Sequence, residues 1–186
     1  MSTKTQTKVR GVKEILEQDR AALQTAIGAT NVMALPRLTQ VVISTGVGKV
    51  NKDKKRLELV VDRLSRITGQ KPASRGAKKS IAAFKSRQGD VVGYAVTLRG
   101  ARMYGFVDKL LNAALPRIRD FRGFDQKVID TMGNLTIGLR EHTIFPETAD
   151  EDVKDVFGLA ITFATTAKNK AEALALFRAI GFPFKK

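Results

Sequence analysis

The chain has 186 residues and a formal net charge of +15, with 33 Lys and Arg against 18 Asp and Glu. It has no cysteine and a single histidine, which excludes disulfides, thiol nucleophiles, iron–sulfur clusters and zinc sites built on cysteine or several histidines. No apolar run approaches the roughly 20 residues of a membrane-spanning helix, so we expect no membrane role. A pI of about 10.3 is typical of a protein that binds a polyanion, and a merely soluble basic protein is the alternative.

The first ten residues are rich in Ser, Thr and Lys and carry no acid, which predicts a disordered basic tail. We expect residues 11–186 to form a single domain, because no linker or internal repeat divides them. No apolar signal-peptide core is present, and we expect a cytoplasmic protein. Apolar residues recur at helical spacing over Val12–Ile27 and predict a first helix that ends at Gly28. The β-branched run Leu38–Ser44 predicts the first strand.

The middle of the chain predicts a helix, a basic loop and a hairpin. Asn51 is expected to cap a helix that ends at Gly69. Residues 70–80 are mostly small or basic and predict a loop. Ile81–Lys85 and Val91–Leu98 flank a Gln-Gly-Asp turn, and this pattern predicts a hairpin.

The C-terminal half predicts two helices and two strands. The helices are expected over Met103–Ala114, ended by Pro116, and from a capping Asn169 to Gly181. The strands are expected over Leu135–Arg140 and Leu159–Thr165. Because helices and strands do not strictly alternate, we predict an α+β fold: a single domain with a largely antiparallel sheet packed on helices, and with protruding basic loops.

The charge is distributed unevenly. Residues 1–93 hold 19 Lys and Arg against 7 Asp and Glu, whereas residues 94–186 hold 14 against 11. The basic residues are densest from Lys71 to Arg102. An acidic stretch lies further on and comprises Glu147, Asp150, Glu151, Asp152 and Asp155. The basic end could hold a polyanion and the acidic stretch a basic protein, although an ordinary solvated loop is the simpler interpretation of the acids.

Three segments are candidates for contact with nucleic acid. Gly46-Val47-Gly48, followed by Lys49, either lets the backbone approach a phosphate closely or forms only a tight turn. Lys71–Ser80 offers cations and hydroxyls to phosphates, with a solvated loop as the alternative. Pro116–Phe124 interleaves three arginines with aromatic residues, which suits stacking on bases, but a loop held by its own Arg–Asp pairs explains it equally well.

Two further patterns resemble functional motifs, but the sequence around them argues against those functions. Arg102–Lys109 matches five of seven positions of the RNA-recognition-motif signature, but its apolar residues recur at helical rather than strand spacing. Glu141 and His142 are the sole acid–base pair that the sequence suggests. Adjacent residues on a strand would point to opposite faces, so we expect a structural histidine. We predict no enzyme, no cofactor and no metal site.

Several motifs follow one another in order from about residue 31 to the C-terminus. They are Pro36-Arg37, Gly46-Val47-Gly48, Thr68-Gly69-Gln70-Lys71-Pro72, Lys79-Ser80-Ile81-Ala82-Ala83-Phe84-Lys85, Val96-Thr97-Leu98-Arg99-Gly100, Pro116-Arg117-Ile118-Arg119-Asp120-Phe121-Arg122-Gly123, Ile144-Phe145-Pro146-Glu147 and Thr165-Thr166-Ala167-Lys168. Together they resemble the bacterial large-subunit ribosomal protein five family. The first thirty residues match that family poorly.

The resemblance implies an antiparallel sheet backed by helices, in a structural protein of the large ribosomal subunit. Such a protein binds 5S rRNA and anchors it in the central protuberance. The family's three polar contacts to 5S rRNA fall at Ser44, Gln70 and Thr97, and we add the neighbouring Gly46, Gly48 and Lys49 to this site. The family usually has asparagine where Ser44 stands, and the shorter side chain loses a direct contact or replaces it by water. We also expect contact with 23S rRNA, and no homo-oligomer.

The resemblance implies two further contacts. The basic loop with Arg75, Lys78, Lys79 and Ser80 matches the family's segment near the peptidyl-site tRNA, although the family often has threonine and lysine in place of Arg75 and Gly76. A bridge to a basic small-subunit protein is expected from Arg117, Arg119, Arg122, Asp150, Glu151 and Asp152.

Overall fold

The fold is built on a five-stranded antiparallel sheet, as the sequence predicts. The computed structural model describes residues 11–48, 53–84, 86–149 and 156–185. The strands are β1 (Leu38–Gly46), β2 (Ala73–Gly76), β3 (Val91–Leu98), β4 (Leu135–Leu139) and β5 (Leu159–Thr165). Their order is β2-β3-β1-β5-β4, and each neighbouring pair is antiparallel. The middle strand β1 therefore has a hydrogen-bonded partner on either side.

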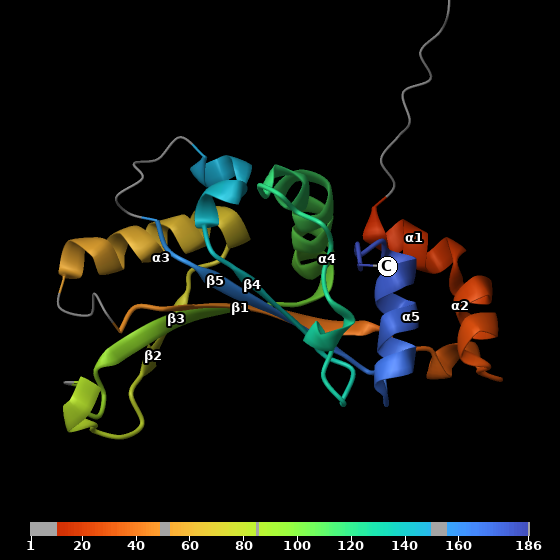
Figure 1. The fold of residues 1–186 in the computed structure, drawn as a ribbon, viewed down its shortest axis with the longest axis horizontal. Helices are drawn as coiled ribbons and strands as arrows, with labels where there is room; N and C mark the ends of the chain where they lie inside the picture. The colour runs from red at the N-terminus through yellow and green to blue at the C-terminus, as the bar shows by residue number, and fades with distance from the viewer. Residues whose placement is uncertain (1–10, 49–52, 85, 150–155, 186) are drawn as a thin grey trace, which may run out of the picture.

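The described residues form five α-helices beside the sheet. They are α1 (Val12–Gln18), α2 (Arg20–Ile27), α3 (Lys54–Thr68), α4 (Gly100–Lys109) and α5 (Lys170–Ile180). Helices α3 and α4 lie on the same face of the sheet, whereas α1, α2 and α5 pack together beside one end of it (Figure 1). Within the described residues, no helix is long and apolar enough to cross a membrane.

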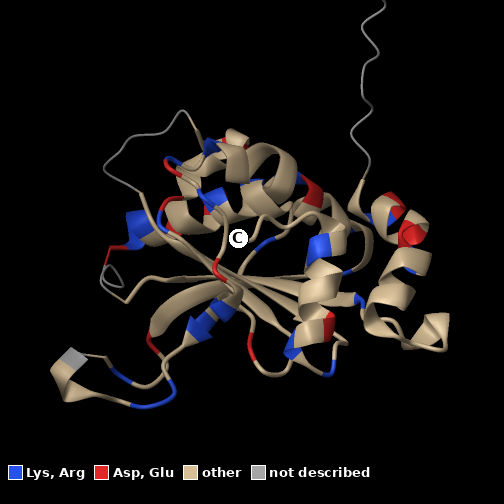
Figure 2. Ribbon diagram, turned by 45° about the vertical axis from the view of Figure 1, so that its right-hand side comes forward, with Lys and Arg blue, Asp and Glu red and all other residues tan. Residues whose placement is uncertain are grey.

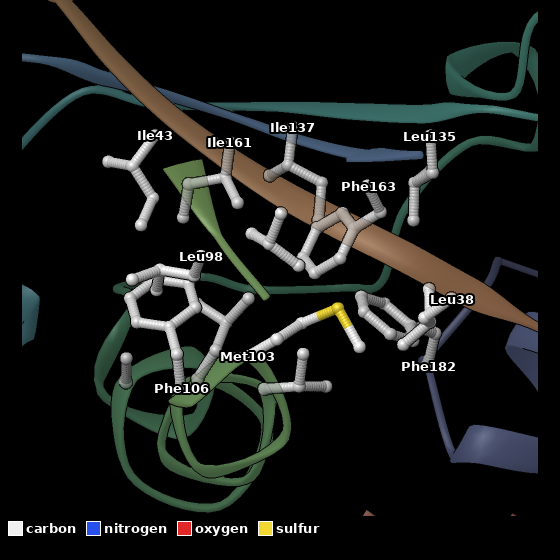
Figure 3. Packing of buried hydrophobic residues seen from close by; sticks show 14 of the residues in the cluster. Leu38, Ile43, Leu98, Met103, Phe106, Leu135, Ile137, Ile161, Phe163 and Phe182 are labelled. Atoms are coloured by element: carbon white, nitrogen blue, oxygen red, sulfur yellow. The ribbon is translucent and has the colours of Figure 1, made fainter. Parts of the chain in front are cut away.

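The core lies between the sheet and the helices α3, α4 and α5. Alternate residues of β1 are buried, with Val41 and Ile43 fully inaccessible, because successive side chains of a strand point to opposite faces. Met103 and Phe106 of α4 meet this face from the other side (Figure 3). Phe163, Phe177 and Phe182 form an edge-to-face aromatic cluster where α5 joins the sheet.

The sequence predicts a single N-terminal helix, and this prediction is wrong in one respect. The segment forms two helices, α1 and α2. Asp19 ends α1 and begins α2 with non-helical dihedral angles of φ −88° and ψ 10°. Aspartate is unfavourable inside a helix and favoured at its ends, which explains a break at this residue. The predicted end at Gly28 is confirmed, with φ at +71°.

The predicted hairpin is also wrong. On the side away from β1, β3 pairs with β2, which lies inside the segment predicted as a loop. Ile81 instead forms an isolated bridge to Ser86 around a short 3-10 turn, Ala82–Phe84. All four residues of β2 are exposed, so its pairing depends on backbone hydrogen bonds and leaves no pattern of buried side chains in the sequence.

The helix ends depart from prediction by a few residues. Asn51, the predicted cap, lies outside the described residues, and the side chain of Asp53 caps α3 by accepting from the Arg56 N–H. Helix α4 begins at Gly100 and continues through a π-helical segment, Leu110–Ala114, into a 3-10 turn at Pro116. The last helix is confirmed. Its Asn169 cap accepts from the Glu172 N–H at 2.9 Å and its amide donates to the Glu172 carboxylate at 3.0 Å.

Candidate nucleic-acid interface

One face of the sheet is lined by small and hydroxyl-bearing residues. It lies opposite α3 and α4, and no α-helix of the described residues covers its central part (Figure 1). The register places residues of this face side by side across the strands: Thr136, Thr162, Val42 and Thr97 in one row, and Gly138, Ala160, Ser44 and Ala95 in the next. We call this surface the open face. It is smooth because its second row has no side chain larger than that of serine.

Two of the three predicted polar contacts lie on the open face. Thr97 pairs with Val42, and Ser44 pairs with Ala95 on the same two strands. Ser44 and Thr97 are therefore diagonal neighbours, a relation that separates residues by about 7–8 Å in an antiparallel pair. Both side chains are partly exposed. Tertiary structure thus brings together two residues that are far apart in the sequence.

Gln70 lies beside the sheet rather than in one of its strands. It follows Gly69, which ends α3 with φ at +67°, and precedes the edge strand β2. Its backbone is held by Thr68, whose hydroxyl donates to the Gln70 carbonyl at 3.0 Å and accepts from the Gln70 N–H at 3.3 Å. The partly exposed side chain therefore starts from a fixed backbone at the β2 edge of the sheet.

At the end of β1, the backbone of Thr45 and Gly46 comes close to Gly93 of β3. Gly46 faces Gly93 on β3, and a Cβ added to Gly93 would lie 2.8 Å from the Thr45 carbonyl oxygen. Gly46 and Gly48 are exposed, with open space where a Cβ would stand. Their φ angles are not positive, so a tight turn does not require glycine at either position. Lys49 lies outside the described residues.

The sequence does not single out three other polar groups at the open face. Thr136 and Thr162 lie next to each other, with their hydroxyl oxygens 3.1 Å apart. Arg99, just beyond β3, donates to the side chain of Gln40 in β1 at 2.5 Å. The alternation of buried Leu and Ile with exposed Thr136 and Gly138 in β4 is a detectable signal, but only the register between strands places Thr136 and Thr162 in one row with Thr97.

A basic arm projects from the β2 edge of the sheet. We define the arm as residues 77–84 and 86–90, which lie between β2 and β3 and extend away from the other strands (Figure 1). Backbone hydrogen bonds between Ala77 and Gly89 and between Ala77 and Asp90 close its base. Lys78, Lys79 and Ser80, together with Arg75 in β2, are exposed, and Lys and Arg mark this part of the ribbon in Figure 2. Among the described residues, no ion pair neutralises these three cations.

The loop after Pro116 borders a hollow of about 610 Å³. Its backbone is anchored at Phe124, whose N–H donates to the Pro183 carbonyl at 2.8 Å. Arg119 approaches Asp120 at 3.9 Å, but both side chains are almost fully exposed, at 97% and 89%. Such a pair contributes little stability, so Arg–Asp pairing does not hold this loop in place. Arg117 and Arg122 are exposed as well.

The acidic stretch is described only in part. Asp150, Glu151 and Asp152 lie outside the described residues. Glu147, at the start of the stretch, accepts from Lys109 at 2.7 Å, and the same ammonium group donates to the Ile67 carbonyl at 2.6 Å. Lys109 of α4 therefore links the end of α3 to Glu147.

His142 is a core residue, as the sequence predicts. Its side chain is 1% exposed and its ring stacks on Phe157 with the centroids 4.2 Å apart. Burial, reinforced by the positive charge of Arg63, lowers the pKa of His142. It lies in a short 3-10 turn rather than in a strand, and the neighbouring Glu141 is exposed. Within the described part of the chain, no group of three or more His, Asp or Glu side chains could hold a metal ion.

The segment that matches the RNA-recognition-motif signature is confirmed as helical. Arg102–Lys109 lies within α4, and Phe106 is buried against Phe145 at a centroid distance of 5.9 Å. Phe106 therefore belongs to the core and cannot stack on RNA bases from a sheet.

The fold and the charge define a basic α+β protein with an open sheet face beside a cationic arm, a class suited to binding a polyanion. Comparison with known families makes the class specific. Residues 31–87 match the family described as "Ribosomal protein L5", and residues 91–184 match the model of the C-terminus of the same ribosomal protein family. The chain belongs to this family, and it is a structural constituent of the ribosome rather than an enzyme.

Curated relatives agree over almost the whole chain. The chain is 49% identical to "Large ribosomal subunit protein uL5" of Heliobacterium modesticaldum, over 94% of this chain and 97% of that protein. The protein of the same name from Desulfatibacillum aliphaticivorans is 49% identical over 93% of this chain and 97% of its own length. That of Ureaplasma parvum is 48% identical over 88% and 89%, respectively.

Proposed function

We propose that this chain is part of the large ribosomal subunit and binds 5S rRNA there through the open face, anchoring it in the central protuberance. The names of its relatives support the location, and the family resemblance supports 5S rRNA as the ligand. The observation that carries the proposal is the row of hydroxyl groups on an uncovered sheet face, at Thr136, Thr162 and Thr97, with Ser44 beside it.

The shape of the open face suits duplex RNA. An RNA helix presents a wide, shallow minor groove lined by 2′-hydroxyls, and its major groove is too narrow and deep for side chains to read. Hydroxyl groups can both donate to and accept from 2′-hydroxyls. Ala95, Ala160 and Gly138 between them allow the RNA to approach the backbone closely. Ser44 offers a shorter side chain than the asparagine usual in the family, which leaves room for a bridging water.

Positive charge lies where RNA phosphates would flank such a groove. Arg99 is exposed and is held by Gln40 over one side of the open face. Gly46 and Gly48 present uncovered backbone at the end of β1, next to Lys49 in the sequence. We include these residues, together with Gln70, in the proposed 5S rRNA site.

We further propose that the arm approaches the peptidyl-site tRNA. Lys78, Lys79 and Ser80 are exposed on the arm, which extends beyond the β2 edge of the sheet and could contact a second RNA while the sheet holds the first. Arg75 is exposed at the base of the arm, opposite Gly93 in the row next to Ser44 and Ala95. A contact with 23S rRNA is part of the same proposal, since a net charge of +15 exceeds what one short duplex contact needs.

A bridge to a basic small-subunit protein is proposed for Asp150, Glu151 and Asp152, whose charge complements such a partner. The arginines assigned to the same bridge, Arg117, Arg119 and Arg122, have the opposite sign. A basic partner would be repelled by them, so the charge of this loop favours another ligand.

The proposed 5S rRNA site is tested by removing hydroxyl groups without opening a cavity. Thr97→Val and Ser44→Ala should together weaken 5S rRNA binding about five- to 150-fold, because each of the two lost hydrogen bonds contributes about 0.5–1.5 kcal/mol. Thr25→Val on the distant helix α2 is the matched control. Affinities are measured by filter binding at one fixed salt concentration. Equal affinities for the double variant, the control and the parent would remove both residues from the site.

A free-standing RNA chaperone is the competing hypothesis. A constituent of the large subunit cosediments with that subunit stoichiometrically in magnesium, whereas a chaperone remains mostly in the free fraction. A sucrose-gradient profile of the full chain in cell extract therefore distinguishes the two.

A further inference from the structure

The hollow beside the loop after Pro116 has no role in the functions proposed so far. It measures about 610 Å³ and lies between this loop and the segment that follows β4. This volume falls within the roughly 300–1,000 Å³ of sites that take small ligands. We propose that the hollow receives one unstacked nucleotide of an RNA, with the base against its apolar wall and the phosphates on its arginines.

The apolar wall can hold a base. Ile118, Phe121 and Ile144 line the hollow and are only partly buried, so their surfaces remain accessible. Phe121 is oriented by an edge-to-face contact with Phe124, with ring centroids 5.0 Å apart and planes at 66°. This contact orients the Phe121 ring before a base binds. Proteins bind single-stranded RNA largely by stacking its bases on such aromatic rings.

The charge of the hollow selects a phosphate-bearing ligand. Arg117, Arg119 and Arg140 line it, against Asp120 and Glu141. Arg119 is 97% exposed, and its contact with Asp120 is too long and too solvated to bind its guanidinium strongly. A guanidinium remains charged at all relevant pH values and pairs with phosphate through two parallel hydrogen bonds.

The position of the hollow also favours RNA. Gly138 of the edge strand β4 lines the hollow and pairs with Ala160, which in turn lies next to Ser44 in the second row of the open face. The hollow therefore borders the open face at the edge opposite the arm. An RNA held on the open face, as proposed above and on which this inference rests, could place an unpaired nucleotide there.

Photo-crosslinking of the full chain to hexauridylate that contains 4-thiouridine tests the inference. Cross-links are expected within residues 118–124. Arg119→Ala, which alters a fully solvated side chain, should reduce both cross-linking and affinity about three- to tenfold, because it removes a guanidinium that pairs with a phosphate of the bound RNA. Arg178→Ala on α5 removes the same charge from an exposed site elsewhere and should have little effect. Phe121→Leu should reduce cross-linking while the circular dichroism spectrum is unchanged.

Three outcomes would overturn the inference: cross-links confined to the arm, equal losses from Arg119→Ala and Arg178→Ala, or full displacement of hexauridylate by inorganic polyphosphate of equal charge, which has no bases. Arg119-dependent binding of hexaglutamate but not of hexauridylate would assign the hollow to an acidic protein partner instead.

The same variants identify the source of the nucleotide and keep this test separate from that of the open face. If Arg119→Ala weakens binding of 5S rRNA as well as hexauridylate, the nucleotide belongs to 5S rRNA. Unchanged 5S affinity with weaker hexauridylate binding assigns it to another RNA. If Thr97→Val and Ser44→Ala leave 5S binding intact while the cross-link to residues 118–124 persists, the open-face proposal fails and the hollow remains a nucleotide site.

Discussion

At the scale of single residues, the position of a side chain in the fold decides its role more than its residue type does. Ser44 and Thr97 are ordinary polar residues in two β-branched runs, and they become a candidate site because the register makes them diagonal neighbours on an uncovered face. His142 shows the opposite case. It is the only titratable imidazole of the chain, and burial against Phe157 makes it part of the core.

The burial of His142 predicts a pH-dependent stability. The folded state lowers the pKa of His142 below its value in the unfolded chain, near 6.5, so the unfolded chain binds the proton more readily. Stability from this residue is therefore fully present above the unfolded pKa and decreases as the pH falls from there toward the folded pKa. His142→Gln should lose this dependence. Urea midpoints of parent and variant at about pH 7.5 and about pH 5.5 measure it.

A parent that is no more sensitive to this pH change than His142→Gln would contradict the prediction. Carboxylates contribute at lower pH in both proteins, and the comparison removes their common effect.

At the scale of elements, the sheet depends on close contact between β1 and β3. Gly46 and Gly93 face each other across these strands, but only Gly93 has backbone where a side chain would begin. The two positions therefore form a matched pair for testing how tightly the strands approach.

Gly93→Ala should destabilise the fold by about 1–3 kcal/mol, because its Cβ would lie 2.8 Å from the Thr45 carbonyl oxygen and the strands must separate. Gly46→Ala should cost less than Gly93→Ala, since nothing lies within 4 Å of its Cβ. Urea denaturation followed by circular dichroism compares the two. Equal midpoints would show that the strands relax freely at this point.

The arm is expected to act independently of the sheet. Lys78→Ala with Lys79→Ala should leave both stability and 5S rRNA affinity nearly unchanged, because both side chains are exposed on a projection from the sheet edge. The double variant should loosen tRNA in the peptidyl site of reconstituted ribosomes, as measured by tRNA dissociation on filters. Lys54→Ala with Lys55→Ala on α3 is the control. A large loss of 5S affinity with unchanged tRNA retention would reverse this assignment.

For the whole molecule, the net charge of +15 predicts a strong salt dependence of RNA binding. The logarithm of 5S rRNA affinity should fall linearly with the logarithm of salt concentration, by about 0.7–0.9 per phosphate neutralised. Filter binding over a series of salt concentrations gives the slope. Arg99→Ala should reduce its magnitude by about one phosphate, because Gln40 holds this guanidinium beside the open face. A slope identical to that of the parent would exclude Arg99 from phosphate contact.

The sequence by itself determined the elements whose causes are local. The strand β1 follows from a β-branched run, the start of α5 from the Asn169–Glu172 capping box, and the ends of α2, α3 and α5 from glycines in the left-handed conformation. The sequence also predicts the α+β class, the ribosomal family and a structural rather than catalytic role for His142. Each of these depends on residue types at short spacing, which the chain displays directly.

Only the tertiary structure decided features that depend on pairing between distant segments. The four residues of β2 are all exposed, so no pattern of apolar residues predicts this strand. It forms because β3 supplies the backbone partners for its hydrogen bonds. The threonines of β4 and β5 join Thr97 in one row only through the register of four strands. The hollow beside Phe121 likewise requires two separate segments of the chain to meet. Side-chain periodicity reports which face of an element is buried, but not which element lies next to it.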